Sequence, residues 1–298
     1  MTFFGQSTEA TDLSDVCEND NFDIVILAFI TSLSPPKLNM GKDTGSASDA
    51  QKNQEGWELF DGTVAPEGGR SMADQISGCQ EKGRTVMISF GGDERFSNAT
   101  FESEDEAKEA ADQVWNLYLG GTDSQDLRPF GSEIKLDGLD LDNESGNGKF
   151  YKEFVTELRS KMDSDPSKDY LMSAEPMCAF FNDAESSIPD SVLPMLDFVN
   201  VQFYNNEAQG IGGSEFKSAI QSWAGKLAAA SPSPKLFLGV PGGKGAASTN
   251  IQSADEIKKT ITSVKGMNLT GFGGVGVWDA GFAMADDVFP EAVKSSLV

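Results

Sequence analysis

Four carboxylates lie in a short, otherwise apolar stretch, and this feature most constrains what the chain can form. Residues 136–144 read Leu-Asp-Gly-Leu-Asp-Leu-Asp-Asn-Glu. An ionised carboxylate is costly to desolvate, so apolar runs rarely contain so many. In a strand with period two, Asp140, Asp142 and Glu144 share one face, and Asp137 is out of phase with them. Because like charges at close range cannot all ionise, the pattern predicts carboxyls that stay protonated for general-acid chemistry.

Composition removes most other kinds of catalytic chemistry. The 298 residues include no histidine, which excludes Ser-His-Asp and Cys-His triads, His-ligated zinc and His-ligated haem. Three cysteines, Cys17, Cys79 and Cys178, are too few and too scattered for a zinc cluster. The sequence contains no P-loop motif, and its glycine-rich stretch at 271–276 lacks the dinucleotide spacing. We therefore expect carboxylate chemistry with no cofactor and no metal.

The net charge of −24 argues against binding to nucleic acid or to an anionic membrane surface. The acidic residues are spread along the chain, as on a solvated surface that favours solubility. This excess of acidic over basic residues suits a soluble extracellular protein that acts on a neutral polymer. The sequence has no transmembrane run and no visible signal peptide, and it begins like the middle of a strand. We expect a monomer that is secreted, either extracellular or in the cell wall, with Met1 added to a truncated or mature chain.

Two plausible N-glycosylation triplets, at Asn98 and Asn268, agree weakly with secretion. Asn143 also begins such a triplet, but it lies inside the acidic strand, so we discount it.

Short β-rich runs alternate with helical patterns about eight times along the chain. We predict strands at 2–5, 23–30, 84–90, 136–142, 169–174, 197–203, 235–240 and 272–278. We predict helices at 11–19, 70–82, 102–119, 148–163, 188–195, 214–229, 253–265 and 289–297. Eight such units without an internal linker indicate one α/β domain over residues 1–298, a (β/α)8 TIM barrel. A doubly wound sheet is the alternative.

Residues 31–69 form a long loop after the second strand, rich in Ser, Pro, Gly and Asp. In a barrel this loop would overhang the C-terminal face, where active sites lie. Trp57 within it could bind sugar or anchor the loop, and the sequence does not decide.

The far ends of the barrel strands would supply the site. Glu144 would lie at the mouth, with Asp142 and Asp140 progressively deeper, and Tyr204 and Trp278 would follow other strands. Asp142 and Glu144 would approach a sugar from the same side, with no evident nucleophile opposite them. A 2-acetamido group on the substrate could then attack its own anomeric carbon. Asp142 would orient that amide, Glu144 would protonate the leaving oxygen, Tyr204 would donate to the acetamide and Trp278 would form an apolar floor.

The segment Asp137-Gly-Leu-Asp-Leu-Asp-Asn-Glu144 matches the DxxDxDxE motif of glycoside hydrolase family 18, and the whole chain resembles its class III, hevamine-type chitinases, fungal ones included. Other segments that carry the resemblance are Ala107-Lys108, Trp115-Asn116, Leu119-Gly-Gly121, Arg128-Pro-Phe-Gly131, Val201-Gln-Phe-Tyr-Asn-Asn206, Leu236-Phe-Leu-Gly-Val-Pro241 and Gly274-Val-Gly-Val-Trp-Asp279. The resemblance implies a (β/α)8 barrel, retaining endo-hydrolysis of β-1,4-linked N-acetylglucosamine, an oxazolinium intermediate and no metal.

The resemblance also implies roles for individual residues. Glu144 would be the acid and later the base for water, Asp142 would orient the acetamide, and Asp140 would share a proton with Asp142. The substrate-binding positions would be Gln202, Asn205 and Trp278 together with Tyr204, a catalytic position, whereas Asp137, Ser89, Gly91 and Gly92 would be structural. Cys17 and Cys79 match a pair that is bridged in relatives. Cys178 matches a family cysteine whose partner position, near Gln209, is not Cys, so we expect a free thiol.

Several positions depart from the family pattern. Glu175 and Met177 stand where relatives have a small residue and Gln, and Phe3 and Phe4 stand where Tyr-Trp is common. We expect Glu175, Met177 and Phe3 near the substrate. These departures keep open an endo-β-N-acetylglucosaminidase that cleaves the chitobiose core of N-glycans. A non-catalytic lectin or inhibitor is a further alternative, disfavoured because Glu144 is present. A calcium loop at 137–144 is disfavoured because the EF-hand spacing is absent.

Overall fold

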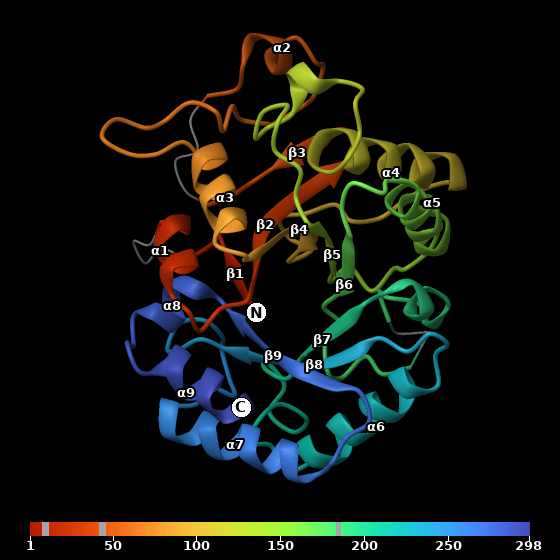
Figure 1. Cartoon of the computed structure of the whole chain (residues 1–298). Coiled ribbons are helices and arrows are strands. Elements are labelled where there is room, and N and C mark those ends of the chain that lie inside the picture. Colours follow the sequence, from red (N-terminus) through yellow and green to blue (C-terminus); the bar gives the residue numbers. More distant parts are fainter. Residues whose placement is uncertain (8–11, 42–45, 183–185) are drawn as a thin grey trace.

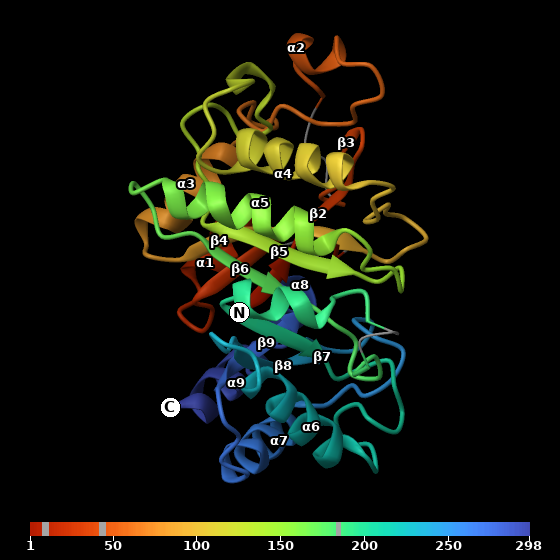
Figure 2. The same cartoon turned by 90° about the vertical axis from the view of Figure 1, so that its right-hand side faces the viewer.

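The chain forms a closed barrel of parallel strands surrounded by helices. The computed structural model describes residues 1–7, 12–41, 46–182 and 186–298. β1 (Thr2–Phe4) pairs in parallel with both β2 (Ile24–Leu33) and β9 (Phe272–Trp278), which closes the sheet into a barrel. Figure 1 shows the strands in the centre with helices around them. In Figure 2, the arrowheads of β5 and β7 point to the same side, so their C-terminal ends share one face.

The remaining elements alternate around this barrel. The other strands are β3 (Pro36–Leu38), β4 (Thr85–Gly92), β5 (Gly138–Asn143), β6 (Leu171–Ala174), β7 (Phe198–Gln202) and β8 (Lys235–Pro241). The long helices are α3 (Met72–Glu81), α4 (Glu104–Tyr118), α5 (Tyr151–Ser164), α6 (Phe216–Ala228), α7 (Ala254–Gly266) and α9 (Phe289–Leu297). The short ones are α1 (Leu13–Glu18), α2 (Asp49–Lys52), α8 (Ala280–Met284) and the 3₁₀ helices η1 (Gln125–Leu127) and η3 (Asp190–Met195). The predicted (β/α)8 barrel is confirmed, and a doubly wound sheet is excluded by its closure.

Three local predictions need correction. The segment expected as a helix at 188–195 is a 3₁₀ helix with Pro194 inside it, because proline has no N–H for an α-helical bond. Helix α8 was not anticipated, since it is only five residues long. The expected loop 31–69 contains the end of β2, the strand β3 that pairs antiparallel with it, and α2. Part of this loop, 42–45, and the start of the predicted helix at 11–19 lie outside the described residues.

The period-two pattern of the strands separates two apolar layers. Val25 and Leu27 of β2 belong to the large core between strands and helices, while Ile26 belongs to a smaller cluster inside the barrel. On β5, Leu139 and Leu141 lie in the outer core in the same way. Since alternate side chains point to opposite faces, the acids of β5 face the barrel interior.

Helix ends are held by specific polar groups. Ser103 caps α4 by accepting from the Glu106 N–H, and Glu256 accepts from the backbone N–H of Ser253 at 2.9 Å at the start of α7. The latter confirms the helix entry expected at Ser253. At the other end of α4, the buried guanidinium of Arg128 donates to the carbonyls of Asn116 and Leu119 at 2.6 and 2.8 Å. A cation there satisfies orphan carbonyls at the helix C-terminus.

The three cysteines are arranged as expected. Cys17 on α1 and Cys79 on α3 form a disulfide. Cys178 is a buried free thiol, and burial raises its pKa to about 11. In the described part of the chain, no helix is both long and apolar enough to cross a membrane.

Candidate active site

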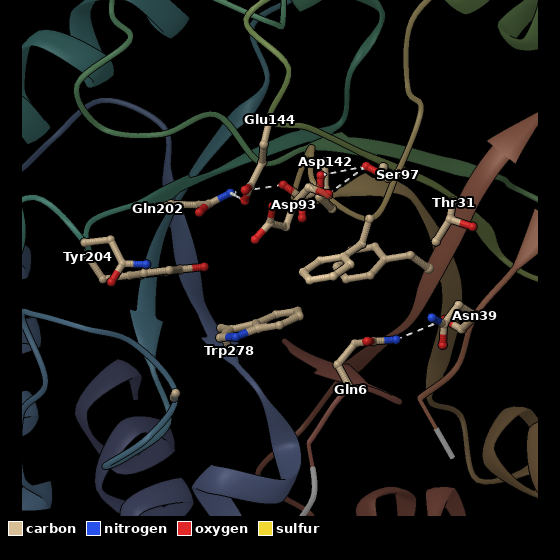
Figure 3. A pocket seen from close by; sticks show the side chains of 16 residues that line it. Gln6, Thr31, Asn39, Asp93, Ser97, Asp142, Glu144, Gln202, Tyr204 and Trp278 are labelled. Atoms are coloured by element: carbon tan, nitrogen blue, oxygen red, sulfur yellow. Dashed lines mark hydrogen bonds between the residues drawn. The ribbon is translucent and has the colours of Figure 1, made fainter. Parts of the chain in front are cut away.

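A cavity of about 420 Å³ opens at the C-terminal ends of the barrel strands. Its walls come from segments at the ends of β1, β2, β4, β5, β7 and β9, and Figure 3 shows the side chains that point into it. The lining residues are Gln6, Phe29, Thr31, Asn39, Gly91, Gly92, Asp93, Phe96, Ser97, Asp142, Glu144, Gln202, Tyr204, Asn205, Ala246 and Trp278. This is the end of the barrel at which the sequence predicts the site.

Two glycines at the end of β4 make room for the acidic wall. Gly91 has φ +122°, and a Cβ there would lie 2.1 Å from the carbonyl oxygen of Asp142. Gly92 has φ +88°, and a Cβ there would lie 3.0 Å from the Phe29 ring. A side chain at either position would be strained and would clash, so only glycine fits.

Asp140 is the deepest acid of β5 and is completely buried. The Ser89 hydroxyl donates to its Oδ2 at 2.7 Å, and the Ser173 hydroxyl donates to its Oδ1 at 2.6 Å. Burial raises the pKa of Asp140 to about 6, and the hydrogen bonds from the two serines oppose this rise. Ser89 was expected to be structural, and it holds Asp140 directly.

Gln202, at the end of β7, connects the two upper acids. Its amide Nε2 donates to Asp142 Oδ1 at 3.0 Å and to Glu144 Oε1 at 3.2 Å (Figure 3). The pKa of Asp142 lies well above its ordinary value because of burial, with the nearby charges of Glu144 and Asp140 adding to the shift. The pKa of Glu144 is also raised, chiefly by burial. Glu144 is thus favoured in its protonated form, as a general acid requires.

Aromatic and hydroxyl groups complete the cavity. The Trp278 ring packs against Phe3 and stacks on Phe29, with ring centroids 5.3 and 5.7 Å away. Figure 3 shows Trp278 on the side of the cavity opposite Glu144 and Asp142. Burial raises the pKa of Tyr204 well above its usual value, so its hydroxyl remains a hydrogen-bond donor. Asn205 is exposed at the rim, where its Oδ1 accepts from the Ser248 N–H at 2.8 Å.

Three expected substrate contacts lie outside the cavity lining. Phe3 is only 3% exposed and packs against Trp278, because its pairing with Ile26 of β2 places it inside the barrel. Glu175 is likewise 3% exposed and lies inside the barrel. Met177 pairs with Gln202 through a backbone bridge and does not line the cavity. Asp137, at the opposite end of β5, pairs with Lys168 at 2.6 Å and accepts from the Val86 N–H at 2.7 Å, which fits its expected structural role.

Sequence reasoning missed several lining residues. Gln6, Phe29, Thr31, Phe96 and Ser97 carry no pattern of their own, and Phe29 in particular resembles an ordinary core residue of an apolar strand. Its stacking on Trp278 is what places Phe29 at the cavity, and the sequence does not show this contact. Asn39 was inside the predicted loop 31–69 without being named.

Among its described residues, the predicted loop reaches the cavity through Thr31 and Asn39 alone. Its described remainder packs sideways against the segment around η1, where the Gly62 N–H donates to the Pro129 carbonyl at 2.7 Å and Phe60 contacts Phe130. Figure 1 shows α2 accordingly at the outer edge of the molecule. Trp57 packs against the core and does not line the cavity, so it anchors the loop.

The carboxylates that line the described cavity all come from one side. Asp142 lies on β5 and Glu144 directly follows it, while Asp93 follows the neighbouring strand β4. The Asp93 carboxylate accepts from the Arg95 guanidinium at 2.9 Å, and this hydrogen bond lowers its pKa. Retaining glycosidases that use an enzyme nucleophile need a second carboxylate across the sugar. Within the described residues, the facing wall offers Trp278 instead, and no group of three acids or thiols is arranged to hold a metal ion.

Comparison with known proteins agrees with this geometry. The family model of the glycosyl hydrolases family 18 matches residues 1–269. Endochitinase 3 of Metarhizium anisopliae is 34% identical over 97% of this chain and 94% of its own length. Among solved structures, the ICChI chitinase from Ipomoea carnea has a TM-score of 0.78 at 24% identity, covering 99% of this chain and 98% of its own. A xylanase and alpha-amylase inhibitor protein from Scadoxus multiflorus has a TM-score of 0.77 at 23% identity, covering 99% and 97%.

Proposed function

Because the chain belongs to the glycosyl hydrolases family 18, we propose that it is an endo-acting chitinase that cleaves β-1,4-linked N-acetylglucosamine with retention of configuration. The observation that carries the proposal is the pair of raised-pKa acids, Asp142 and Glu144, bridged by Gln202 on one wall of the cavity. A general acid and an acetamide-orienting acid on the same side need no second carboxylate across the ring.

In the first step, the carbonyl oxygen of the substrate's own 2-acetamido group attacks the anomeric carbon. Glu144 gives its proton to the departing glycosidic oxygen, and an oxazolinium ion forms. Asp142 accepts a hydrogen bond from the acetamide N–H and balances the positive charge that develops there. The Trp278 ring supports the apolar face of the sugar, and the Tyr204 hydroxyl donates to the acetamide oxygen.

In the second step, Glu144 acts as a base. The carboxylate left by the first proton transfer takes a proton from water, which attacks the anomeric carbon from the face that the leaving group vacated. The oxazolinium ring opens, the acetamide is restored and Glu144 is protonated again. The two displacements together retain the configuration of the anomeric carbon.

The fold alone does not distinguish an enzyme from an inhibitor, since a protein named as an inhibitor has a similar structure. The presence of Glu144 with its raised pKa favours an enzyme. The test is parallel digestion of a chito-oligosaccharide and a high-mannose glycoprotein, with products separated by mass. We expect shorter chito-oligosaccharides and an intact glycoprotein. Release of the glycan alone would contradict the chitinase proposal, and binding without any turnover would contradict an enzyme.

We further propose that the protein is secreted into an oxidising compartment. The Cys17–Cys79 disulfide supports this, because such bonds persist mainly outside the reducing cytosol. Asn98 and Asn268 are exposed and accessible to glycosylation, whereas Asn143 is buried and donates to the Asn147 carbonyl. Detection of the natural protein in the cells or in the culture medium of the organism that makes it, followed by glycosidase treatment and mass analysis, tests both points. Protein found only inside the cells would contradict secretion.

A further inference from the structure

Glu175 is a buried carboxyl that the proposed reaction does not use. It follows β6 directly, and its backbone N–H donates to the Leu141 carbonyl at 2.9 Å, which fixes it beside β5. Its side chain is 3% exposed and is not among the residues that line the cavity. The Asn200 amide of β7 donates to its Oε2. A carboxyl this deep requires an explanation, because an isolated buried charge is strongly unfavourable.

The other oxygen of Glu175 shows how the group is accommodated. Its Oε1 is buried and meets no N–H or hydroxyl donor among the residues that the structure describes. Asp140 lies opposite Ser173 in the pairing of β5 with β6, and Glu175 follows Ser173 by two residues on the same face, so the two carboxyls are neighbours inside the barrel. Two ionised carboxylates have no hydrogen to share, so this contact is favourable only when one of them carries a proton. Asp140 already accepts from Ser89 and Ser173, which favours its ionised form, so the proton belongs on Glu175.

We infer that Glu175 is a neutral carboxyl that donates to Asp140, so that the proton-sharing acids of this protein number three rather than two. In this arrangement Glu175, Asp140 and Asp142 hold two protons and one negative charge. Glu175 never touches the substrate and is a positioning residue that acts through Asp140. The inference rests on the proposed function for its kinetic test and on the structure alone for the location of the proton.

The charged and titratable groups near Glu175, Asp140 and Asp142 agree with two protons and one negative charge on these three acids. Burial is the first cause that raises the pKa of Glu175, and the charges of Asp140 and Asp142 raise it further. From β1, the buried amino group of Met1 interacts with Glu175, but burial lowers its own pKa to about 6, so it is largely uncharged at neutral pH. From the rim, the Tyr204 phenol stays protonated and adds no charge. The lone Oε1 therefore has no cation to face.

The arrangement has a consequence for the reaction. As positive charge develops on the acetamide, a proton on Asp142 moves to Asp140, which leaves the negative charge on Asp142 beside the substrate. The readiness of Asp140 to take that proton depends on how many donors hold its carboxylate. Glu175 adds one donor to the two serines, so it lowers the proton affinity of Asp140 and sets the pH at which the pair becomes active.

The kinetic test compares two substitutions at Glu175 by the pH dependence of kcat/KM on a chito-oligosaccharide. Glu175→Gln keeps a neutral side chain that donates to Asp140 and accepts from Asn200. The pKa that governs the loss of kcat/KM at low pH, the acid limb of the profile, should therefore stay within a few tenths of a unit. Glu175→Leu keeps a side chain of similar volume but removes the hydrogen-bond donor to Asp140. The pKa of the acid limb should therefore rise by roughly one unit. Glu109→Gln, on the exposed surface of α4, is the control for the lost carboxyl and should leave the whole profile unchanged. If the pKa of the acid limb falls in both Glu175 variants, Glu175 is ionised in the wild-type protein. If that pKa is unchanged in both variants, the Glu175 side chain only fills space.

A second measurement needs no activity. The infrared difference spectrum between the wild-type protein and Glu175→Gln at pH 7 should show the loss of a protonated carboxyl C=O band. Loss of a carboxylate band instead would overturn the inference even if the enzyme is a chitinase. If the protonated band is lost but no GlcNAc polymer is cleaved, the proposed function fails and the proton assignment stands. The spectrum also decides the question if Glu175→Leu does not fold.

Discussion

The hydrogen bond from Ser173 to Asp140 offers the sharpest test of how the buried acids are tuned. Both residues are completely buried, and the bond is 2.6 Å long. Accepting two or three hydrogen bonds can lower a carboxyl pKa from about 4 to below about 2, so one bond is worth roughly one pKa unit. Ser173→Ala should therefore raise the pKa of Asp140 from about 6 to roughly 7.

The size of the effect depends on pH. If the Asp140–Asp142 pair must carry one negative charge, the active fraction at pH 6 falls from about one half to about one tenth, roughly a fivefold loss in kcat/KM. At pH 8 the active fraction falls by only about 10%, so the variant should be nearly normal. The assay is kcat/KM on a soluble chito-oligosaccharide from pH 4 to 9. Ser160→Ala, on the exposed surface of α5, is the matched control. Equal losses at pH 6 and pH 8, or an acid limb that does not move, would refute the reasoning.

Three other predictions follow from the same structure. Glu144→Gln should keep sugar binding by calorimetry and lose roughly two to four orders of magnitude in turnover, as for the removal of a general acid; near-normal turnover would show that the acid is another group. The Cys17–Cys79 bond spans a sequence separation of 62 residues, so Cys17→Ser with Cys79→Ser should lower the free energy of unfolding by about 4 kcal/mol in chemical denaturation; three reactive thiols in the unfolded, unreduced wild-type protein would mean that the bond is not formed. The buried acids Asp140, Asp142 and Glu175 and the half-buried Glu144 have native pKa values above their unfolded values, so the native state binds more protons and stability should fall as pH rises from 4.5 to 6, by up to about 1.4 kcal/mol per unit for each buried group. Burial lowers the pKa of the Met1 amino group to about 6, so this group opposes the trend only as the pH approaches 6, and an unfolding free energy that rises from pH 4.5 to about 5.5 would contradict the raised values.

Much of the fold was predictable because helices and strands each leave their own spacing of apolar residues in the sequence. Continuous apolar runs such as β2 and β4 require cover on both faces, and their alternation with helical patterns leaves few topologies besides a barrel. The wrong predictions concern segments in which the spacing of apolar residues does not reveal the structure. The 3₁₀ helix η3 has a helical pattern, but Pro194 prevents the α-helical bonding that this pattern suggests. Helix α8 is too short to show a period.

The candidate site was predictable only where charge interrupts an apolar strand. Asp140, Asp142 and Glu144 were visible because burying carboxylates is costly, Trp278 followed from its position at a strand end, and Gln202 followed from the resemblance to a family. Phe29 and Gln6 were not visible, since an aromatic in a core strand and a lone amide are ordinary. Glu175 was recognised as unusual but assigned to the mouth. Its true depth depends on where β6 ends relative to β5, which pairs Leu141 with Ala174 and so places Glu175 inside the barrel. Register of this kind depends on packing between strands and cannot be derived from one segment.

The central claim of the account is that the substrate's acetamide group performs the attack. The most direct measurement compares kcat/KM for a chito-oligosaccharide with that for the glucosamine oligomer of the same length, which lacks the acetyl arms. Loss of an intramolecular nucleophile should reduce the rate by at least about three orders of magnitude, since well-placed internal groups have effective molarities of 10⁵ M or more. Comparable cleavage of the two oligomers would show that an enzyme group attacks instead, and the account would be wrong.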